Sequence, residues 1–248
     1  EGMRRATGDM IMFLDSDDYL YPDACSRVAE VFAADVSLVQ FRLDKVTVDG
    51  EKIGLLPVIP LISSGHKAYV LKHGFIPTSP TSGNAFASEH IRRMIATIDP
   101  DTEARNFIDG YVIFSAPFTG RVVGVDEPLG AYLVHGGNVS MAGGRHYKAV
   151  VNSVKTALWQ RKGYLRILAQ QRQESEAQIH IRALASLAPF HYRNALILRR
   201  GYADRESLLS ELGTLELAML AWQGFLRFPR MSLRTRLFNI LGVSFTLL

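Results

Sequence analysis

Three aspartates, Asp15, Asp17 and Asp18, stand directly after an apolar run at residues 10–14. We interpret this run as a strand buried on both faces of a parallel sheet, and open α/β sheets bind their ligands at the carboxyl ends of such strands. Clustered carboxylates repel one another and lower stability unless a positive charge lies among them. A divalent cation, Mg²⁺ or Mn²⁺, that holds a diphosphate is the simplest such partner, because these ions prefer oxygen ligands. The cluster therefore predicts metal-assisted handling of a phosphorylated substrate.

The same acidic run has other interpretations. It fits a solvated turn that caps the next helix, with Asp18 supplying negative charge at the helix N-terminus. An EF-hand is excluded, because Leu20 stands at the sixth position counted from Asp15, where that loop requires glycine. A haloacid-dehalogenase-like phosphatase also has two aspartates after an apolar strand, the first being its nucleophile. Tyr19 stands where that family expects Thr or Val, which disfavours this alternative and leaves it open.

A fourth aspartate, Asp109, lies in or at the start of a mostly apolar segment, 106–116, that we expect to form a buried helix. A buried carboxylate without a partner is unfavourable, so its presence needs a reason. One reason is catalysis, in which Asp109 takes a proton from a hydroxyl group. The other is helix capping, because Asn106 and Asp109 have the spacing of a capping box.

Two loops carry further polar candidates. His135 lies in a glycine-rich loop with Asn138 and Ser140, where it is a metal ligand, a donor to a diphosphate or an ordinary loop histidine. Gly83 and Asn84 follow a proline-rich stretch, and they either let the backbone approach a substrate or form an ordinary turn.

The elements that must position these residues alternate between helix and strand as far as residue 143. We expect helices at 22–34, 67–72 and 89–96, and strands at 37–48, 85–88, 121–125 and 131–134, with a turn at 126–130. After Gly144 the pattern changes to long helices with breaks near Pro189 and Gly201. One helical seam is predicted by apolar residues that step by four and three: Leu208, Leu212, Leu215, Met219, Trp222 and Leu226. We therefore predict an α/β domain at 1–143 and a helical region at 144–248.

Composition indicates a globular chain with an uneven charge. The 248 residues are 48% hydrophobic and 21% charged. Cys25 is the only cysteine, which excludes an internal disulfide and favours a reducing, cytoplasmic setting. The net charge of +4 divides into −4 for residues 1–150 and +8 for residues 151–248. The second part suits an anionic partner or is simply a solvated surface, and we expect no nucleic acid.

The C-terminal segment adds a basic amphipathic pattern. Arg227, Arg230 and Arg234 have helical spacing, and four leucines supply apolar bulk: Leu226, Leu233, Leu237 and Leu241. Such a segment either lies on an anionic membrane leaflet or packs as a tail on its own domain or a second copy. The uncharged run 237–248 is shorter than the ~20 residues that span a bilayer.

These motifs occur in an order that resembles family 2 glycosyltransferases. Residues 2–18, GMRRATGDMIMFLDSDD, are similar to that family's G-x-x-x-A-x-G-x-x-I-x-F-L-D-x-D-D run. Asp109 stands where the family has its acidic catalytic residue, and residues 122–140 are similar to its closing Y-R-x-H-x-x-N-x-S segment. The resemblance covers about residues 1–140. Ile108 replaces a frequent Glu, and Leu133 replaces the usual Arg.

The resemblance implies a GT-A fold, which is Rossmann-like with a mixed, mostly parallel sheet, and a divalent cation. It further implies inverting transfer of a sugar from a nucleotide-diphosphate sugar to an acceptor hydroxyl. The resemblance implies that Asp15 contacts the donor sugar or ribose, that Asp17 binds the metal with help from His135, and that Asp109 is the general base. We also predict donor binding by Asp17 and Asp18, metal binding by His135, and acceptor binding by Gly83 and Asn84. We expect the chain to be truncated, because roughly eighty to a hundred residues that form the family's nucleotide pocket are absent, and to be inactive without them.

Three functions follow from these patterns. The first is a glycosyltransferase of cell-surface or extracellular polysaccharide synthesis, acting at the cytoplasmic membrane face on a glycan, lipid-linked or other hydroxyl acceptor. The alternatives are the metal-dependent phosphatase and a non-catalytic membrane-docking module.

Overall fold

The computed structural model describes residues 2–73, 76–97, 108–135, 147–169, 175, 178, 183–184, 187–201, 209–227 and 231–245. The chain forms two compact units. The α/β unit comprises Glu1–Tyr69 and Ile76–Ala142, and the helical unit comprises Val70–Phe75 and Gly143–Leu248. The division assigns residues 70–75 to the helical unit, whereas the predicted domains, 1–143 and 144–248, place them in the first domain; this domain assignment stays a prediction.

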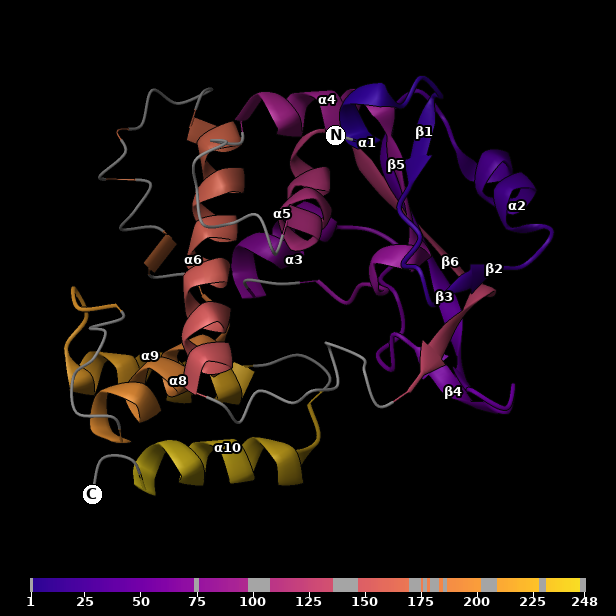
Figure 1. The fold of residues 1–248 in the computed structure, drawn as a ribbon. Coiled ribbons are helices and arrows are strands. Elements are labelled where there is room, and N and C mark those ends of the chain that lie inside the picture. Colours follow the sequence, from indigo (N-terminus) through magenta and orange to yellow (C-terminus); the bar gives the residue numbers. More distant parts are fainter. Residues whose placement is uncertain are drawn as a thin grey trace. The chain divides into compact units, whose positions relative to one another are not determined.

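The α/β unit is built on a mixed sheet whose strand order is β1-β5-β3-β6-β2, with β4 also paired to β3 (Figure 1). The strands are β1 (Met10–Met12), β2 (Tyr19–Leu20), β3 (Val36–Thr47), β4 (Lys52–Leu56), β5 (Asn84–Ala87) and β6 (Arg121–Val134). One edge of β3 pairs in parallel with β6, and the other edge pairs antiparallel with β5 and then with β4. β1 and β2 pair antiparallel with β5 and β6 respectively.

The structure corrects three predictions about this sheet. Its described pairs are mostly antiparallel, not mostly parallel, because β4 returns beside β3 through a tight turn at Gly50 and β5 enters from the opposite direction. The first strand is shorter than predicted and only Ile11 within it is buried, so it is not enclosed on both faces. The predicted turn at 126–130 is absent, because β6 runs on through a register shift against β3.

Helices cover the sheet on both sides. They are α1 (Gly2–Arg5), α2 (Ala24–Val31), α3 (His66–His73), α4 (Ser88–Thr97) and α5 (Ile108–Ser115), with short 3₁₀ turns η1 (Thr81–Gly83) and η3 (Ala116–Phe118). On one face Val39 and Phe41 of β3 pack with Val28 of α2. Since side chains alternate along a strand, Gln40 points to the other face, where it hydrogen-bonds Asn84. α4 and α5 are joined by His90, whose Nε2 donates to the carbonyl oxygen of Val112 at 2.9 Å.

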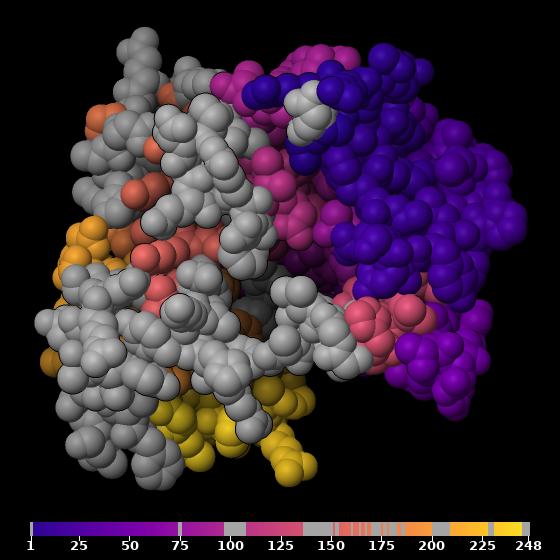
Figure 2. Space-filling view, viewed as in Figure 1, coloured from indigo at the N-terminus to yellow at the C-terminus, as the bar shows by residue number. Residues whose placement is uncertain are grey.

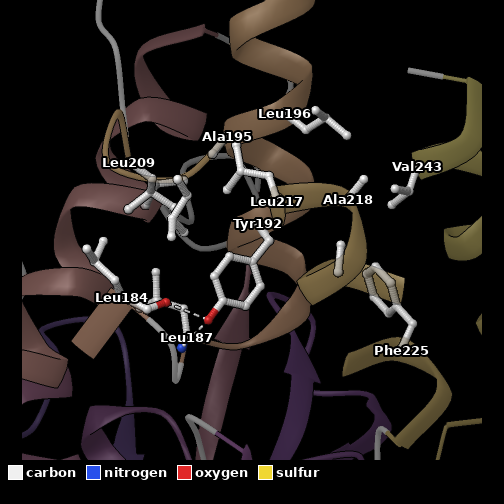
Figure 3. Packing of buried hydrophobic residues seen from close by; sticks show 13 residues of the cluster. Leu184, Leu187, Tyr192, Ala195, Leu196, Leu209, Leu217, Ala218, Phe225 and Val243 are labelled. Carbon is white, nitrogen blue, oxygen red and sulfur yellow. Dashed lines mark hydrogen bonds between the residues drawn. The ribbon is translucent and has the colours of Figure 1, made fainter. Parts of the chain in front are cut away.

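The helical unit has its own hydrophobic core. Its longer helices are α6 (Tyr147–Ala169), α8 (Pro189–Gly201), α9 (Thr214–Arg227) and α10 (Leu233–Phe245). At the centre of the core, Tyr192 donates its hydroxyl to the carbonyl oxygen of Leu184 at 2.7 Å and accepts from the amide of Leu187 at 2.9 Å (Figure 3). Among the helices that the structure describes, none has both the length and the apolar character needed to cross a membrane.

Within the helical unit, a buried arginine donates hydrogen bonds to backbone carbonyl oxygens at the C-terminal end of α3. The side chain of Arg161 in α6 is 2% exposed. Its guanidinium donates to the carbonyl oxygens of Val70 at 2.6 Å and Leu71 at 3.0 Å. These carbonyls belong to the last turn of α3, where helical geometry leaves acceptors without an intrahelical partner.

The predicted helical seam is wrong. Helix α9 begins at Thr214, and its buried residues are Leu217, Ala218, Ala221 and Phe225. Leu215, Met219 and Leu226, which the seam prediction placed inward, are exposed. The stepped pattern misleads because α9 is apolar nearly all round, so periodicity alone does not identify the face that packs. Leu208 lies outside the described residues.

The predicted helical arrangement of Arg227, Arg230 and Arg234 is also not found for the two arginines that the structure describes. Arg227 ends α9 and Arg234 lies in α10, so the two side chains do not share one helical face. Arg230 lies outside the described residues.

Candidate active site

The acidic run forms a turn between β1 and β2. The amide of Asp18 donates to the carbonyl oxygen of Asp15 at 3.1 Å, which closes the turn. The backbone is therefore not extended here. Because of the turn, the three carboxylates have three different environments.

Asp18 is the buried member of the run. Its Oδ1 accepts from the backbone amide of Leu133 at 3.1 Å, and its Oδ2 accepts from the hydroxyl of Ser82 at 2.6 Å. The interaction uses the backbone of Leu133, so the side chain at that position does not take part in it. Two hydrogen bonds compensate a carboxylate that is 8% exposed. Asp18 thus joins the turn to β6 and to η1, and it does not cap α2.

Asp17 is paired with His135, which follows β6. Nε2 of His135 lies 2.8 Å from Oδ2 of Asp17, and about a third of each side chain is exposed. The hydrogen bond from His135 is the main reason that the pKa of Asp17 is lowered. The predicted association of these two residues is therefore present in the structure. Asn138 and Ser140, in the same glycine-rich segment, lie outside the described residues.

Asp15 is surrounded by negative charge. Partial burial raises its pKa first, and repulsion from Asp18, Asp17 and Asp109 raises it further. Its own amide donates to the hydroxyl of Ser82 at 3.1 Å, which fixes the position of the backbone. A carboxylate disfavoured by three neighbouring carboxylates is the electrostatic signature of a site suited to a cation.

Asp109 reaches the same region from the first turn of α5. Its side chain is exposed, not buried as predicted, and its Oδ2 accepts from the hydroxyl of Thr81 at 3.1 Å. An acidic side chain in the first turn is also favoured by the helix dipole. Asn106, its predicted capping partner, lies outside the described residues.

Thr81 and Ser82 in η1 were missed by the sequence reasoning. Their adjacent hydroxyls hold different parts of the site, because Thr81 binds Asp109 whereas Ser82 binds Asp18 and the amide of Asp15. A short hydroxyl side chain has no periodic or spacing signal, so nothing in the sequence singled them out. The one available hint was their position directly before Gly83 and Asn84.

Gly83 and Asn84 are buried and hold the η1 turn in place. A Cβ atom on Gly83 would lie 2.4 Å from Cβ of Ser79 and 2.8 Å from the carbonyl oxygen of Phe41. The side-chain Nδ2 of Asn84 donates to the carbonyl oxygen of Pro80 at 2.7 Å. Their structural role is thus clear, and acceptor binding by these residues stays a prediction.

The site residues fit a cation that also takes ligands from a substrate. Asp17, Asp15 and His135 offer oxygen and nitrogen donors, and the pKa of Asp15 is raised by partial burial and then by the neighbouring carboxylates. In the part of the chain that the structure describes, no group of three or more His, Cys, Asp or Glu side chains is arranged so that it could hold a metal ion. Mg²⁺ and Mn²⁺ commonly complete their coordination with phosphate oxygens and waters, so a partial protein ligand set is compatible with them. A cavity of about 240 Å³ beside Arg4 and Arg92 includes none of the site residues.

The fold and the site define an α/β protein whose carboxylates gather at the turn between β1 and β2, near the C-terminal end of β6. Comparisons with known proteins agree on the class. Residues 1–99 match the family described as Glycosyl transferase family 2. The uncharacterized glycosyltransferase alr2836 of Nostoc sp. (strain PCC 7120 / SAG 25.82 / UTEX 2576) is 32% identical over 146 residues, which cover 57% of this chain and 44% of that protein. The chain thus spans less than half the length of this relative.

Among solved structures, the crystal structure of S. aureus TarS 1-349 in complex with UDP-GlcNAc aligns with 99% of this chain and 69% of that chain, at a TM-score of 0.45 and 10% identity. Residues 1–99 are thus assigned to a glycosyl transferase family 2 domain. This assignment replaces the phosphatase alternative.

Proposed function

We propose that the protein is an inverting glycosyltransferase with a GT-A fold, which moves a sugar from a nucleotide-diphosphate sugar to an acceptor hydroxyl. The observation that carries this proposal is the meeting of Asp15, Asp17, Asp18 and Asp109 around one turn, with His135 bonded to Asp17. The match of residues 1–99 to glycosyl transferase family 2 supports the same reaction class.

Asp109 is the proposed general base. Thr81 holds Oδ2, so the exposed carboxylate presents Oδ1 toward an acceptor. In the reaction the acceptor oxygen forms a bond to the anomeric carbon while the bond from that carbon to the diphosphate oxygen breaks. The hydroxyl proton passes to Asp109, and the electron pair leaves with the diphosphate. A single displacement from the opposite side inverts the configuration of the anomeric carbon.

Asp17 and His135 are the proposed protein ligands of a divalent cation, and Asp15 is the proposed contact to the donor sugar or ribose. The cation, when bound, neutralises negative charge on the departing diphosphate. Its positive charge also relieves the repulsion that raises the pKa of Asp15. Asp18 serves the donor side indirectly, because its hydrogen bonds to Leu133 and Ser82 fix the turn that carries Asp15 and Asp17.

The experiment measures release of nucleoside diphosphate by the full-length protein with a panel of nucleotide sugars, beginning with UDP-GlcNAc, in the presence of Mg²⁺ or Mn²⁺. Asp109→Asn is expected to lower kcat by about 10²–10⁴-fold, since it removes the base and keeps the side-chain shape. Asp49→Asn, in the β3–β4 turn, is the matched control and is expected to retain full turnover. Circular dichroism checks that both variants fold. Turnover by Asp109→Asn at the level of the control would refute the role of Asp109.

We further place this activity in polysaccharide synthesis at the cytoplasmic face of a membrane, with a glycan or lipid-linked acceptor. The support is the charge of the chain, since residues 151–248 have a net charge of +8. A readout with lipid-linked and free oligosaccharide acceptors tests this part, and transfer to neither would overturn it.

A further inference from the structure

Two neighbouring helices of the helical unit expose apolar side chains on their outer faces. We define the outer face as seven large residues: Leu215, Met219 and Leu226 of α9, and Leu233, Leu237, Phe238 and Leu241 of α10. Phe238 is 74% exposed and Leu233 is 70% exposed. Yellow atoms of α10 reach the molecular surface in Figure 2. Large apolar residues gathered in this way mark an interaction site more often than scattered ones do.

The core of the helical unit does not need these residues. Ala218 and Phe225 of α9 and Val243 of α10 are fully buried in the core cluster (Figure 3). The indole of Trp222 donates to the carbonyl oxygen of Ile240 at 3.3 Å, and this hydrogen bond links α9 to α10. Both helices therefore have an inner face that packs and an outer face that is apolar as well.

The outer face of α10 is a continuous stripe. Leu233, Leu237 and Leu241 follow one another at intervals of four residues, and Phe238 lies beside Leu237, so all four share one side of the helix. Arg234 lies among them and is exposed. A long basic side chain in this position extends its guanidinium toward the polar boundary while its methylene stem stays among apolar neighbours.

The charge around this stripe has one sign. The sequence from residue 217 to residue 248 contains no Asp or Glu and four arginines: Arg227, Arg230, Arg234 and Arg236. Arg227 and Arg234 are exposed. An apolar stripe bordered by arginines matches a surface that combines hydrocarbon with negative headgroups. It is a poorer match to a second copy of the same face, because α10 has no carboxylate to pair with the arginines and Glu216 lies at the opposite end of α9 from Arg227.

We propose that the outer face of α9 and α10 binds an anionic lipid surface. The leucines and Phe238 enter the region between headgroups and acyl chains, and Arg227 and Arg234 meet lipid phosphates. The inference deepens the membrane placement proposed above, yet its test does not require sugar transfer. Docking by this face keeps the enzyme beside a lipid-linked acceptor.

The experiment is co-sedimentation of the full-length protein with vesicles of phosphatidylcholine that contain about 30% phosphatidylglycerol, compared with phosphatidylcholine alone. The wild type is expected to bind the anionic vesicles at least ~10-fold more tightly, and 0.5 M NaCl is expected to weaken this binding because salt screens exposed charges. Replacing Leu237 and Phe238 together by Asp is expected to reduce binding at least ~10-fold. Replacing Arg227 and Arg234 by Ala is expected to reduce the preference for anionic lipid.

Matched controls come from the α/β unit. Val48→Asp with Val58→Asp introduces the same charges at two exposed apolar positions, and Arg92→Ala with Arg93→Ala removes two exposed arginines. Both control pairs are expected to bind vesicles as the wild type does. Circular dichroism confirms that the helices persist in every variant.

Three outcomes would overturn the proposal: equal binding to both vesicle types, loss of binding in the controls as well, or a dimer that the Leu237 and Phe238 replacement dissociates while vesicles have no effect. The last outcome would assign the face to a second copy. Transfer to a free oligosaccharide is expected to be unchanged by the Leu237 and Phe238 replacement, so a failure of lipid binding is distinguishable from a failure of the glycosyltransferase assignment.

Discussion

Charged side chains have opposite energetic roles in the two units of the chain. In the helical unit, Arg161 is buried and donates to two backbone carbonyl oxygens, so its charge is used to complete the structure. In the α/β unit, partial burial and then repulsion from Asp18, Asp17 and Asp109 raise the pKa of Asp15, so its charged form disfavours the folded state. The first arrangement is satisfied by the protein itself, and the second requires a partner from outside. This contrast separates residues kept for folding from residues kept for binding.

The largest expected effect tests the acidic side of the contrast. Asp17→Ala is expected to lower kcat/KM by about 10²–10³-fold, because it removes a proposed cation ligand and the partner of His135. Titration of Mn²⁺ against activity checks the cause, since the metal concentration for half activity is expected to rise. Asp23→Ala, an exposed acid before α2, is the control. An unchanged metal dependence in Asp17→Ala would remove this residue from the ligand set.

The next effect tests the structural side. Arg161→Ala is expected to lower the free energy of unfolding by about 2–4 kcal/mol, because the two carbonyl oxygens at the end of α3 lose their charged donor. Arg161→Lys is expected to lose less, since an ammonium group keeps the charge but lacks the planar fork. Denaturant unfolding measures the change. Hydrogen exchange is expected to increase in the helical unit, and equal loosening of both units would contradict the local role.

A smaller effect concerns Thr81. Thr81→Val keeps the shape of the side chain and removes the hydroxyl that holds Asp109, so kcat is expected to fall by about 10-fold with little change in the KM for the donor. Thr81→Ser is expected to restore most of the rate. If Thr81→Val and Thr81→Ser lowered stability equally and had the same kcat, Thr81 would act only in packing.

The smallest effect is a gain in stability. Asp15→Asn is expected to raise the Tm of the metal-free protein at pH 7.5 by about 1–2 °C, because the ionised carboxylate is disfavoured in the folded state. A carboxyl pKa that is raised on folding means that the folded state binds a proton more readily than the unfolded state. The gain is therefore expected to shrink as the pH falls through that raised pKa, when Asp15 itself becomes neutral. Thermal melts at pH 7.5 and pH 5 measure this difference, and a constant gain would exclude charge repulsion as its cause.

The sequence predicted the helices and strands of the α/β unit better than their pairing. The long strand expected at 37–48 is β3 at Val36–Thr47, because its β-branched alternation is a local signal. Pairing direction is not local, and the sheet predicted as mostly parallel is mostly antiparallel. In α9 the outward and inward faces were exchanged, because both faces are apolar and only tertiary packing distinguishes them.

The candidate site was predicted in part. Sequence order and family resemblance brought Asp17 and His135 together, although 118 positions separate them. The hydroxyls of Thr81 and Ser82 were not predicted, since only the folded turn shows that they face two different groups of acids. Asp18 does not cap a helix and accepts two internal hydrogen bonds, and its binding of the donor stays a prediction.

Gly83 limits which substitutions the η1 turn can accept. Its missing side chain lets the neighbouring backbone of β3 lie so close that even one added carbon would meet Phe41. Thr81 and Ser82, two and one positions earlier, belong to the same short turn, so a shift at Gly83 would displace their hydroxyls. Libraries that randomise this loop to change which sugar or acceptor is accepted should leave position 83 untouched, because a substitution there displaces the pair before it can teach anything about selectivity.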